Sequence, residues 1–79
     1  MGRMLNWAQH GGVWHTYSNK ASAIVYPYAG GFHWEIFVGD SMCWHDQAET
    51  QESAINHVEG NFIGRNLRSD LAIELASAG

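Results

Sequence analysis

Five histidines carry the most versatile chemistry in this sequence, because imidazole binds metal ions and transfers protons near neutral pH. They are His10, His15, His33, His45 and His57. None stands four residues from another, which is the spacing of a metal-binding pair on one helix. His15, His33 and Asp46 could share a sheet face, but two strand spacings put His15 about 10 Å from His33. We therefore predict no metal site and no cofactor. A small metal- or ligand-binding domain using these three residues is an alternative hypothesis.

Cys43 and His45 form the candidate pair for nucleophilic catalysis, because a thiolate beside an imidazole can attack a carbonyl group. Strand periodicity turns Cys43 toward the apolar side of the predicted sheet, where a thiol behaves as a small hydrophobic group. The sequence contains no GxSxG, P-loop or GxGxxG motif. We predict that the protein is not an enzyme.

The sequence also bears on the compartment. Cys43 is the only cysteine, so an internal disulfide is excluded, and a lone thiol is typical of a reducing compartment. The first residues lack the apolar stretch of a signal peptide, and no apolar run is long enough to span a membrane. We expect a cytoplasmic protein that does not bind a membrane.

The net charge of the chain restricts which partners it can bind. Eight acidic residues face four basic ones, for a net charge of −4. Four scattered cations cannot build a phosphate-binding groove, which argues against direct nucleic-acid binding. The carboxylates gather late in the chain, at Asp40, Asp46, Glu49, Glu52 and Glu59. We predict that they form an acidic patch that docks on the basic surface of a protein partner. The alternative is a solvated face whose carboxylates suit a helix N-terminus.

Seventy-nine residues make one domain, whose elements must position these side chains. Residues 1–12 are predicted to be an irregular lead-in. Residues 13–46 alternate aromatic and β-branched residues with turn signals at 19–20, 28–31 and 39–40, which predicts four strands.

The hydrophobic period then changes to that of a helix over residues 50–66, with Ala54, Ile55, Val58 and Phe62 on one stripe. Thr50 is the predicted N-cap, and a capping box from Asp46 to Glu49 is the competing start. Glu52 and Glu59, one heptad apart, are placed on the solvated side. The tail, residues 67–79, fits either a helix or a strand.

These elements predict an α+β fold: an antiparallel β-meander with one helix, in the C-terminal half, packed on one face. The meander has four strands, or five if the tail adds one. A two-residue turn at Gly39-Asp40 places Trp34, Ile36, Val38 and Cys43 on the face that the helix covers.

The opposite face receives His33, Glu35, Phe37, Met42, Trp44 and Asp46, joined by His15, Tyr17, Ile24 and Tyr26. An exposed aromatic face is typical of an interaction site. The candidate partner-binding residues there are Tyr17, Tyr26, Glu35, Phe37 and Trp44. Two alternatives stay open: the tail covers this face, or a one-residue slip exchanges the two faces.

The stretch from Val13 to Phe62 resembles short proteins of phages and mobile elements, in which a Trp-rich β-meander precedes a threonine- or serine-capped helix. Its most recognisable parts are residues 31–38, GFHWEIFV, and residues 50–55, TQESAI. In size, acidity and lack of catalytic motifs it is similar to several anti-CRISPR proteins. That resemblance is architectural and transfers no residue roles.

The resemblance implies a non-enzymatic inhibitor in the cytoplasm of a bacterial host, bound to the basic nucleic-acid-binding surface of a defence complex. We expect such a module to be a monomer or a homodimer. The alternative is a self-associating structural module.

Overall fold

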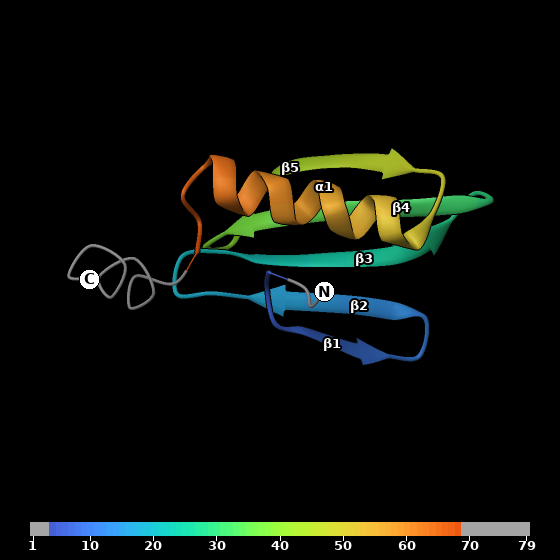
Figure 1. The fold of residues 1–79 in the computed structure, drawn as a ribbon, viewed down its shortest axis with the longest axis horizontal. Helices are drawn as coiled ribbons and strands as arrows, with labels where there is room; N and C mark the ends of the chain where they lie inside the picture. The colour runs from blue at the N-terminus through green and yellow to red at the C-terminus, as the bar shows by residue number, and fades with distance from the viewer. Residues whose placement is uncertain (1–3, 69–79) are drawn as a thin grey trace.

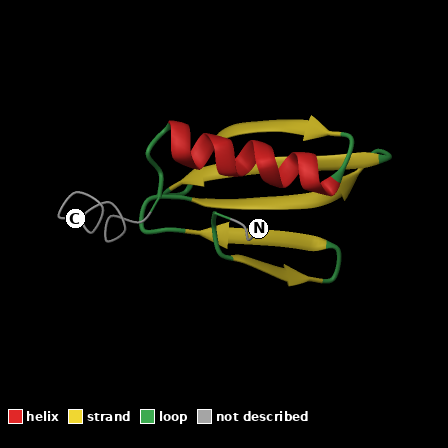
Figure 2. Cartoon of the chain, in the orientation of Figure 1, coloured by secondary structure: helices red, strands yellow, loops and turns green. Residues whose placement is uncertain are grey.

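The computed structural model describes residues 4–68, whose strands form one antiparallel sheet with a helix on one face (Figure 1). The strands are β1 (Trp7–His10), β2 (Val13–Tyr17), β3 (Ser22–Tyr28), β4 (Gly31–Val38) and β5 (Ser41–Ala48), and the helix α1 spans Gln51–Gly64. Strand order in the sheet follows order in the chain. The predicted α+β class, an antiparallel meander with a helix in the C-terminal half, is confirmed (Figure 2).

The fifth strand is β1, in the segment predicted to be an irregular lead-in. It pairs with β2 from Trp7 opposite Thr16 to His10 opposite Val13. Its four residues, WAQH, contain one large apolar side chain, so their alternation is too weak to separate a strand from a loop. The predicted boundary at residue 12 is therefore wrong. The predicted helix or strand of the tail lies outside the described residues from position 69 onward.

The chain reverses at all three predicted turns, but the middle one is shorter than the predicted loop at 28–31, because Tyr28 and Gly31 belong to strands. The pairs that flank them are Tyr17 with Ser22, Tyr28 with Gly31, and Val38 with Ser41. Ala29 and Gly30 have φ values of 51° and 82°, both in the left-handed region that a two-residue hairpin turn of type I′ requires. These turns set the phase of β2, β3 and β4, so side chains alternate there as the sequence predicts.

Local capping fixes both ends of α1. The Thr50 hydroxyl accepts a hydrogen bond from the Ser53 backbone N–H over 3.1 Å, which confirms Thr50 as the N-cap in place of Asp46. At the other end Asn66 has a φ of 59°, and the Leu67 N–H donates to the Phe62 carbonyl over 2.8 Å. This Schellman arrangement brings Leu67 back onto Phe62, so the cap and the core support each other.

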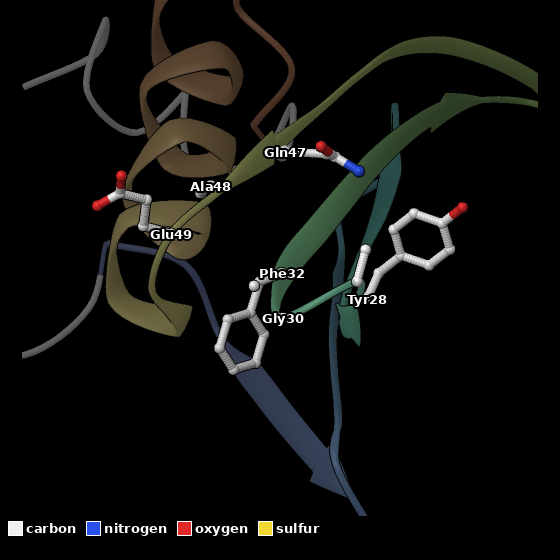
Figure 3. A pocket seen from close by; sticks show the side chains of 8 residues that line it. Tyr28, Gly30, Phe32, Gln47, Ala48 and Glu49 are labelled. Carbon is white, nitrogen blue, oxygen red and sulfur yellow. The ribbon is translucent and has the colours of Figure 1, made fainter.

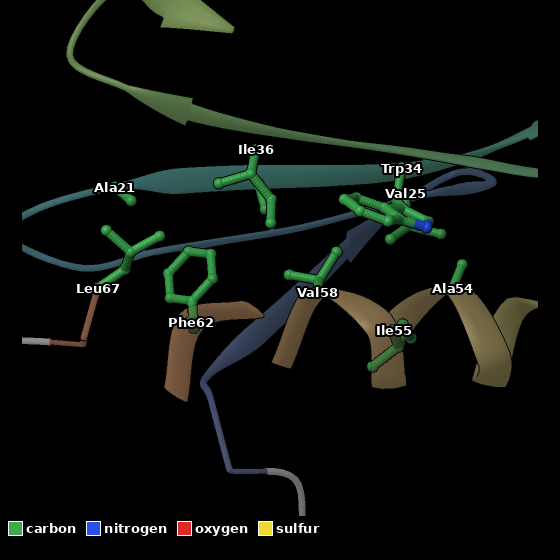
Figure 4. Packing of buried hydrophobic residues seen from close by; sticks show 10 residues of the cluster. Ala21, Val25, Trp34, Ile36, Ala54, Ile55, Val58, Phe62 and Leu67 are labelled. Carbon is green, nitrogen blue, oxygen red and sulfur yellow. The ribbon is translucent and has the colours of Figure 1, made fainter. Parts of the chain in front are cut away.

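The core lies between α1 and one face of the sheet (Figure 4). The helix contacts β3, β4 and β5 and buries the predicted stripe. The residues of this core are Ala21, Ala23, Val25, Trp34, Ile36, Ala54, Ile55, Val58, Phe62 and Leu67. The prediction that the helix covers the Trp34–Ile36 face is therefore confirmed. Burial of this apolar surface is the main stabilising contribution to the domain.

A β-bulge in β5 changes the register between β4 and β5. Phe37 lies opposite Met42 as predicted, but Ile36 lies opposite Trp44, so Cys43 is the extra residue. Beyond it every β5 side chain is turned to the face opposite the predicted one. Cys43 is exposed rather than directed at the helix, so its predicted position in the core is wrong. No residue pattern around Cys43 predicts the bulge.

Among residues 4–68 the structure contains no helix long and apolar enough to cross a membrane.

Candidate functional site

The sheet side opposite α1, called the open face below, is a mosaic of aromatic, histidine and aliphatic side chains. Strand pairing arranges it in rows across β2 to β5. One row holds Tyr17, Ser22, Phe37 and Met42, the next holds His15, Ile24, Glu35 and His45, and the third holds Tyr26, His33 and Gln47. Tyr28 and His10 extend this face at its ends. The face combines large apolar area with hydrogen-bonding groups, as protein interfaces do.

Several of its apolar side chains are unusually exposed. The exposed fractions are 79% for Tyr17, 55% for Tyr28 and 48% for Met42. They come from β2, β3 and β5, so they spread over the face instead of forming one loop tip. A monomeric protein rarely leaves such a surface in water without a binding role. The predicted aromatic face is therefore present in the structure.

Four rings of the open face, those of Tyr26, Tyr28, His33 and His45, form a connected cluster. The ring centroid of His33 lies 5.5 Å from Tyr26, 5.9 Å from Tyr28 and 5.5 Å from His45. The Tyr26 and Tyr28 rings meet edge to face with centroids 6.4 Å apart. These separations are those of favourable aromatic pairs, so the rings hold one another in place without help from the helix.

Glu35 is the carboxylate within this cluster. Its Oε2 accepts a hydrogen bond from the Tyr26 hydroxyl over 2.9 Å and lies 3.6 Å from His33 Nε2. The pKa of Tyr26 is raised above its ordinary value, first because its hydroxyl donates to Glu35, and then because of burial and the negative charge of Glu35. Of the candidate partner-binding residues, Tyr26 and Glu35 thus bond directly to each other.

Trp44 and Asp46 do not belong to this face, contrary to the prediction. The bulge at Cys43 turns Trp44 toward the helix, where it packs against the core and carries the Arg65 guanidinium 4.0 Å from its ring. His45 takes the predicted place of Trp44 on the open face. Tyr17, Tyr26, Glu35 and Phe37 lie on the face as predicted.

Two members of the cluster, Tyr28 and His45, were not predicted to be binding residues. Tyr28 repeats the alternation of Tyr26 two residues later, a signal that the predicted loop at 28–31 concealed. His45 carried no such signal, because its placement depends on the bulge. A histidine and a tyrosine were therefore missed for different physical reasons.

Glu59 is not part of an acidic surface. It is 6% exposed, and its Oε2 accepts hydrogen bonds from the backbone N–H groups of Met4 and Leu5 and from Trp7 Nε1, over 3.1, 3.2 and 2.9 Å. The predicted solvated position is wrong because the segment before β1 bonds to α1 at this residue. Glu59 joins the N-terminal segment to the helix.

The remaining predicted acidic residues divide between two ends of β5. Asp40 lies in the turn before it, and Asp46, Glu49 and Glu52 lie near its far end and the start of α1. Eight residues of strand separate the two positions by about 25 Å. All four are exposed. An acidic patch of Asp46, Glu49 and Glu52 is compatible with the structure, whereas one that includes Asp40 and Glu59 is not.

A shallow depression of about 490 Å³ lies at the end of the sheet, between the β3–β4 turn and the end of β5 (Figure 3). Tyr28, Phe32 and Gln47 line it, with Glu49 at its rim. Gly31 is required there, because a Cβ atom would stand 2.7 Å from the Ala48 carbonyl oxygen. The depression adjoins the open face through Tyr28 and Gln47.

The structure gives no support to the alternative metal hypothesis. His15 and His33 lie in different rows of the open face, and Asp46, opposite Trp34, lies on the other face. Among residues 4–68 no group of three or more histidine, cysteine, aspartate or glutamate side chains is arranged to hold a metal ion. Cys43, the extra residue of the bulge, is exposed, and its thiol lies 3.5 Å from the Ser41 carbonyl oxygen, while His45 lies opposite Glu35.

Comparison with protein-family models, curated proteins and solved structures found no match to this chain. The open face and the packing around it therefore carry the functional argument.

Proposed function

We propose that this chain is a non-enzymatic protein-binding module that uses the open face as its contact surface. The observation that carries the proposal is the exposure of Tyr17, Tyr28 and Met42 beside the ordered ring cluster. Tyrosine is enriched at the energetic centres of protein interfaces, because it adds contact area and a hydrogen bond for little loss of entropy.

The partner surface in this proposal is basic. Among the described residues the cations are Lys20, Arg65 and Arg68, and none belongs to the rows of the open face. Lys20 Nζ lies 3.5 Å from the Asn66 carbonyl, and Arg65 lies over Trp44 on the helix side. The open face thus offers Glu35 without a competing cation, and Asp46, Glu49 and Glu52 provide negative charge that attracts a basic partner during approach.

The specific form of the proposal is a small inhibitor of the anti-CRISPR type. It covers a nucleic-acid-binding surface of a bacterial defence complex and so competes with the nucleic acid. The acidic balance of the chain supports this form, because a surface that binds phosphates attracts carboxylates as well. Self-association through the same face is the competing function.

The proposal can be tested by capture from bacterial lysate with the tagged chain, followed by mass spectrometry. We expect one nucleic-acid-binding protein to be retained, and an oligonucleotide to displace it. The double variant Tyr17→Ser, Tyr28→Ser should lose this protein. The control variant Ile63→Ser, at a helix position that is 40% exposed, should retain it.

Three results would count against the proposal: equal capture by the double variant and the wild type, a captured protein that binds the oligonucleotide undisturbed, or recovery of the tagged chain alone as a dimer. The last result would favour self-association. Circular dichroism of both variants checks that they are folded, which is expected because all three substituted side chains are exposed.

A further inference from the structure

Glu35 has one oxygen engaged and one available. Oε2 takes both the Tyr26 hydroxyl and the approach of His33 Nε2, while Oε1 has no partner among residues 4–68. The side chain of Glu35 is 19% exposed and that of His33 is 16% exposed. The carboxylate is therefore reachable from the open face but is largely withdrawn from water.

A carboxylate in that position favours a cationic partner. Partial removal from water weakens its hydration, and the same reduced polarity strengthens its attraction to an opposite charge. No lysine or arginine of the described residues lies on this face to neutralise it. His33 can do so only when it is protonated.

The surrounding rings select the kind of cation. Tyr26 and His33 lie in the row beside Glu35, and His45 lies opposite Glu35 on β5. Ring faces attract cations, and the flat guanidinium group of arginine can stack on a ring while its N–H groups donate to a carboxylate. Lysine offers a compact and strongly hydrated charge that uses such a site less well.

We propose that Glu35, with the rings of Tyr26, His33 and His45, forms a receptor for an arginine side chain of the partner protein. This inference rests on the proposed function for the existence of a basic protein partner, and it names the residue type that the open face recognises. The arginine donates to Oε1 of Glu35 and lies against the neighbouring rings.

Acidification should weaken this receptor. A protonated His33 would hold the Glu35 carboxylate itself and would add positive charge to the site, and a protonated His45 would add more. The other titratable groups that face His33 are Tyr26 and Tyr28, and Glu35 also lies opposite His45. Arginine binding therefore falls as these histidines gain protons.

The test is a titration of the full ¹⁵N-labelled chain with the blocked tripeptide Gly-Arg-Gly, followed by amide chemical shifts. Gly-Lys-Gly and Gly-citrulline-Gly serve as matched probes, because citrulline keeps the shape of arginine without its charge. We expect saturable shifts at residues 26, 33, 35 and 45 with the arginine probe. Glu35→Gln should weaken binding about fivefold, and the control Asp40→Asn, at an exposed position in the turn before β5 and outside the acidic patch, should not.

A second measurement, on the wild-type chain, tests the inference even if Glu35→Gln disturbs the fold. The same titration of the wild type at about pH 7.5 and about pH 5.5 should show weaker binding at the lower value. The inference is wrong if citrulline or lysine binds as well as arginine, if the shifts centre on residues 46–52, or if acidification leaves the affinity unchanged. A dimer in sedimentation that the arginine probe does not dissociate would assign the face to a second copy and would also overturn it.

The outcome separates the two proposals. If the tripeptide fails but the wild-type chain still captures a partner that the Tyr17→Ser, Tyr28→Ser variant loses, the binding function stands and the arginine receptor does not. If the tripeptide binds Glu35 but no partner is captured, the receptor stands without the inhibitor function.

Discussion

The two faces of the sheet are ordered by different forces, although each residue on one face has a chain neighbour on the other. On the covered face, Val25 and Ile36 are fully buried and packed against α1. On the open face, the rings of Tyr26, His33 and His45 hold one another, and one carboxylate bonds to them. The covered face therefore determines stability, and the open face is free to serve recognition. Substitutions should separate these two properties.

The largest difference is expected between neighbours on β4. Ile36→Ala removes a fully buried side chain and should lower the free energy of unfolding by about 3 to 4 kcal/mol. Phe37→Ala changes the partly buried residue beside it, which faces the other way, and should cost about 1 kcal/mol. Urea unfolding followed by tryptophan fluorescence measures both. Equal losses for the two variants would contradict the division between the faces.

Two carboxylates on α1, the exposed Glu52 and the buried Glu59, lie one heptad apart and allow a second comparison between an exposed and a buried position. Glu59→Ala leaves three N–H donors of Met4, Leu5 and Trp7 without their acceptor, and should cost about 2 to 3 kcal/mol. Glu52→Ala, at an exposed position, should stay within about 0.5 kcal/mol of the wild type. Amide hydrogen exchange should also show β1 losing protection in the Glu59 variant alone. Unchanged protection of β1 would refute the role of Glu59.

The smallest effect concerns the Tyr26–Glu35 hydrogen bond. The pKa of Tyr26 is raised in the folded state, so the folded protein favours the neutral phenol. The stability from this contact is present below the ordinary tyrosine pKa of about 10 and is lost as pH rises through the folded-state pKa. Absorbance at 295 nm should show one late-titrating tyrosine that Tyr26→Phe abolishes. Three tyrosines with one common midpoint near pH 10 would contradict this assignment.

The predictable part of the fold was the part governed by local signals. The turn at Gly39-Asp40, the Thr50 cap and the stripe of Ala54, Ile55, Val58 and Phe62 each depend on residues close in the sequence. They were enough to predict the helix, the meander and which face is covered. β1 was not predicted as a strand, because four residues with one large apolar side chain carry too little periodicity.

The candidate site was predicted only up to the bulge. Tyr17, Tyr26, Glu35 and Phe37 lie before Cys43 in the meander and were placed correctly, whereas Trp44 lies after it and was placed on the wrong face. A bulge depends on how two strands twist and pack, which the sequence of one strand does not encode. Glu59 was misplaced for a similar reason, since its partners lie more than 50 residues away in the chain.

The bulge also affects how copies of the chain behave in concentrated solution. β5 is an edge strand of eight residues, and the unpaired side of such a strand can recruit another chain and start a fibre. The extra residue at Cys43 interrupts the even spacing of backbone N–H and C=O groups along β5. The Gln47 N–H already donates a hydrogen bond to the Asp46 carboxylate over 2.8 Å. A strand from another chain therefore cannot form a regular ladder of hydrogen bonds along this edge. The irregularity that turns Trp44 toward the core also opposes aggregation at this edge.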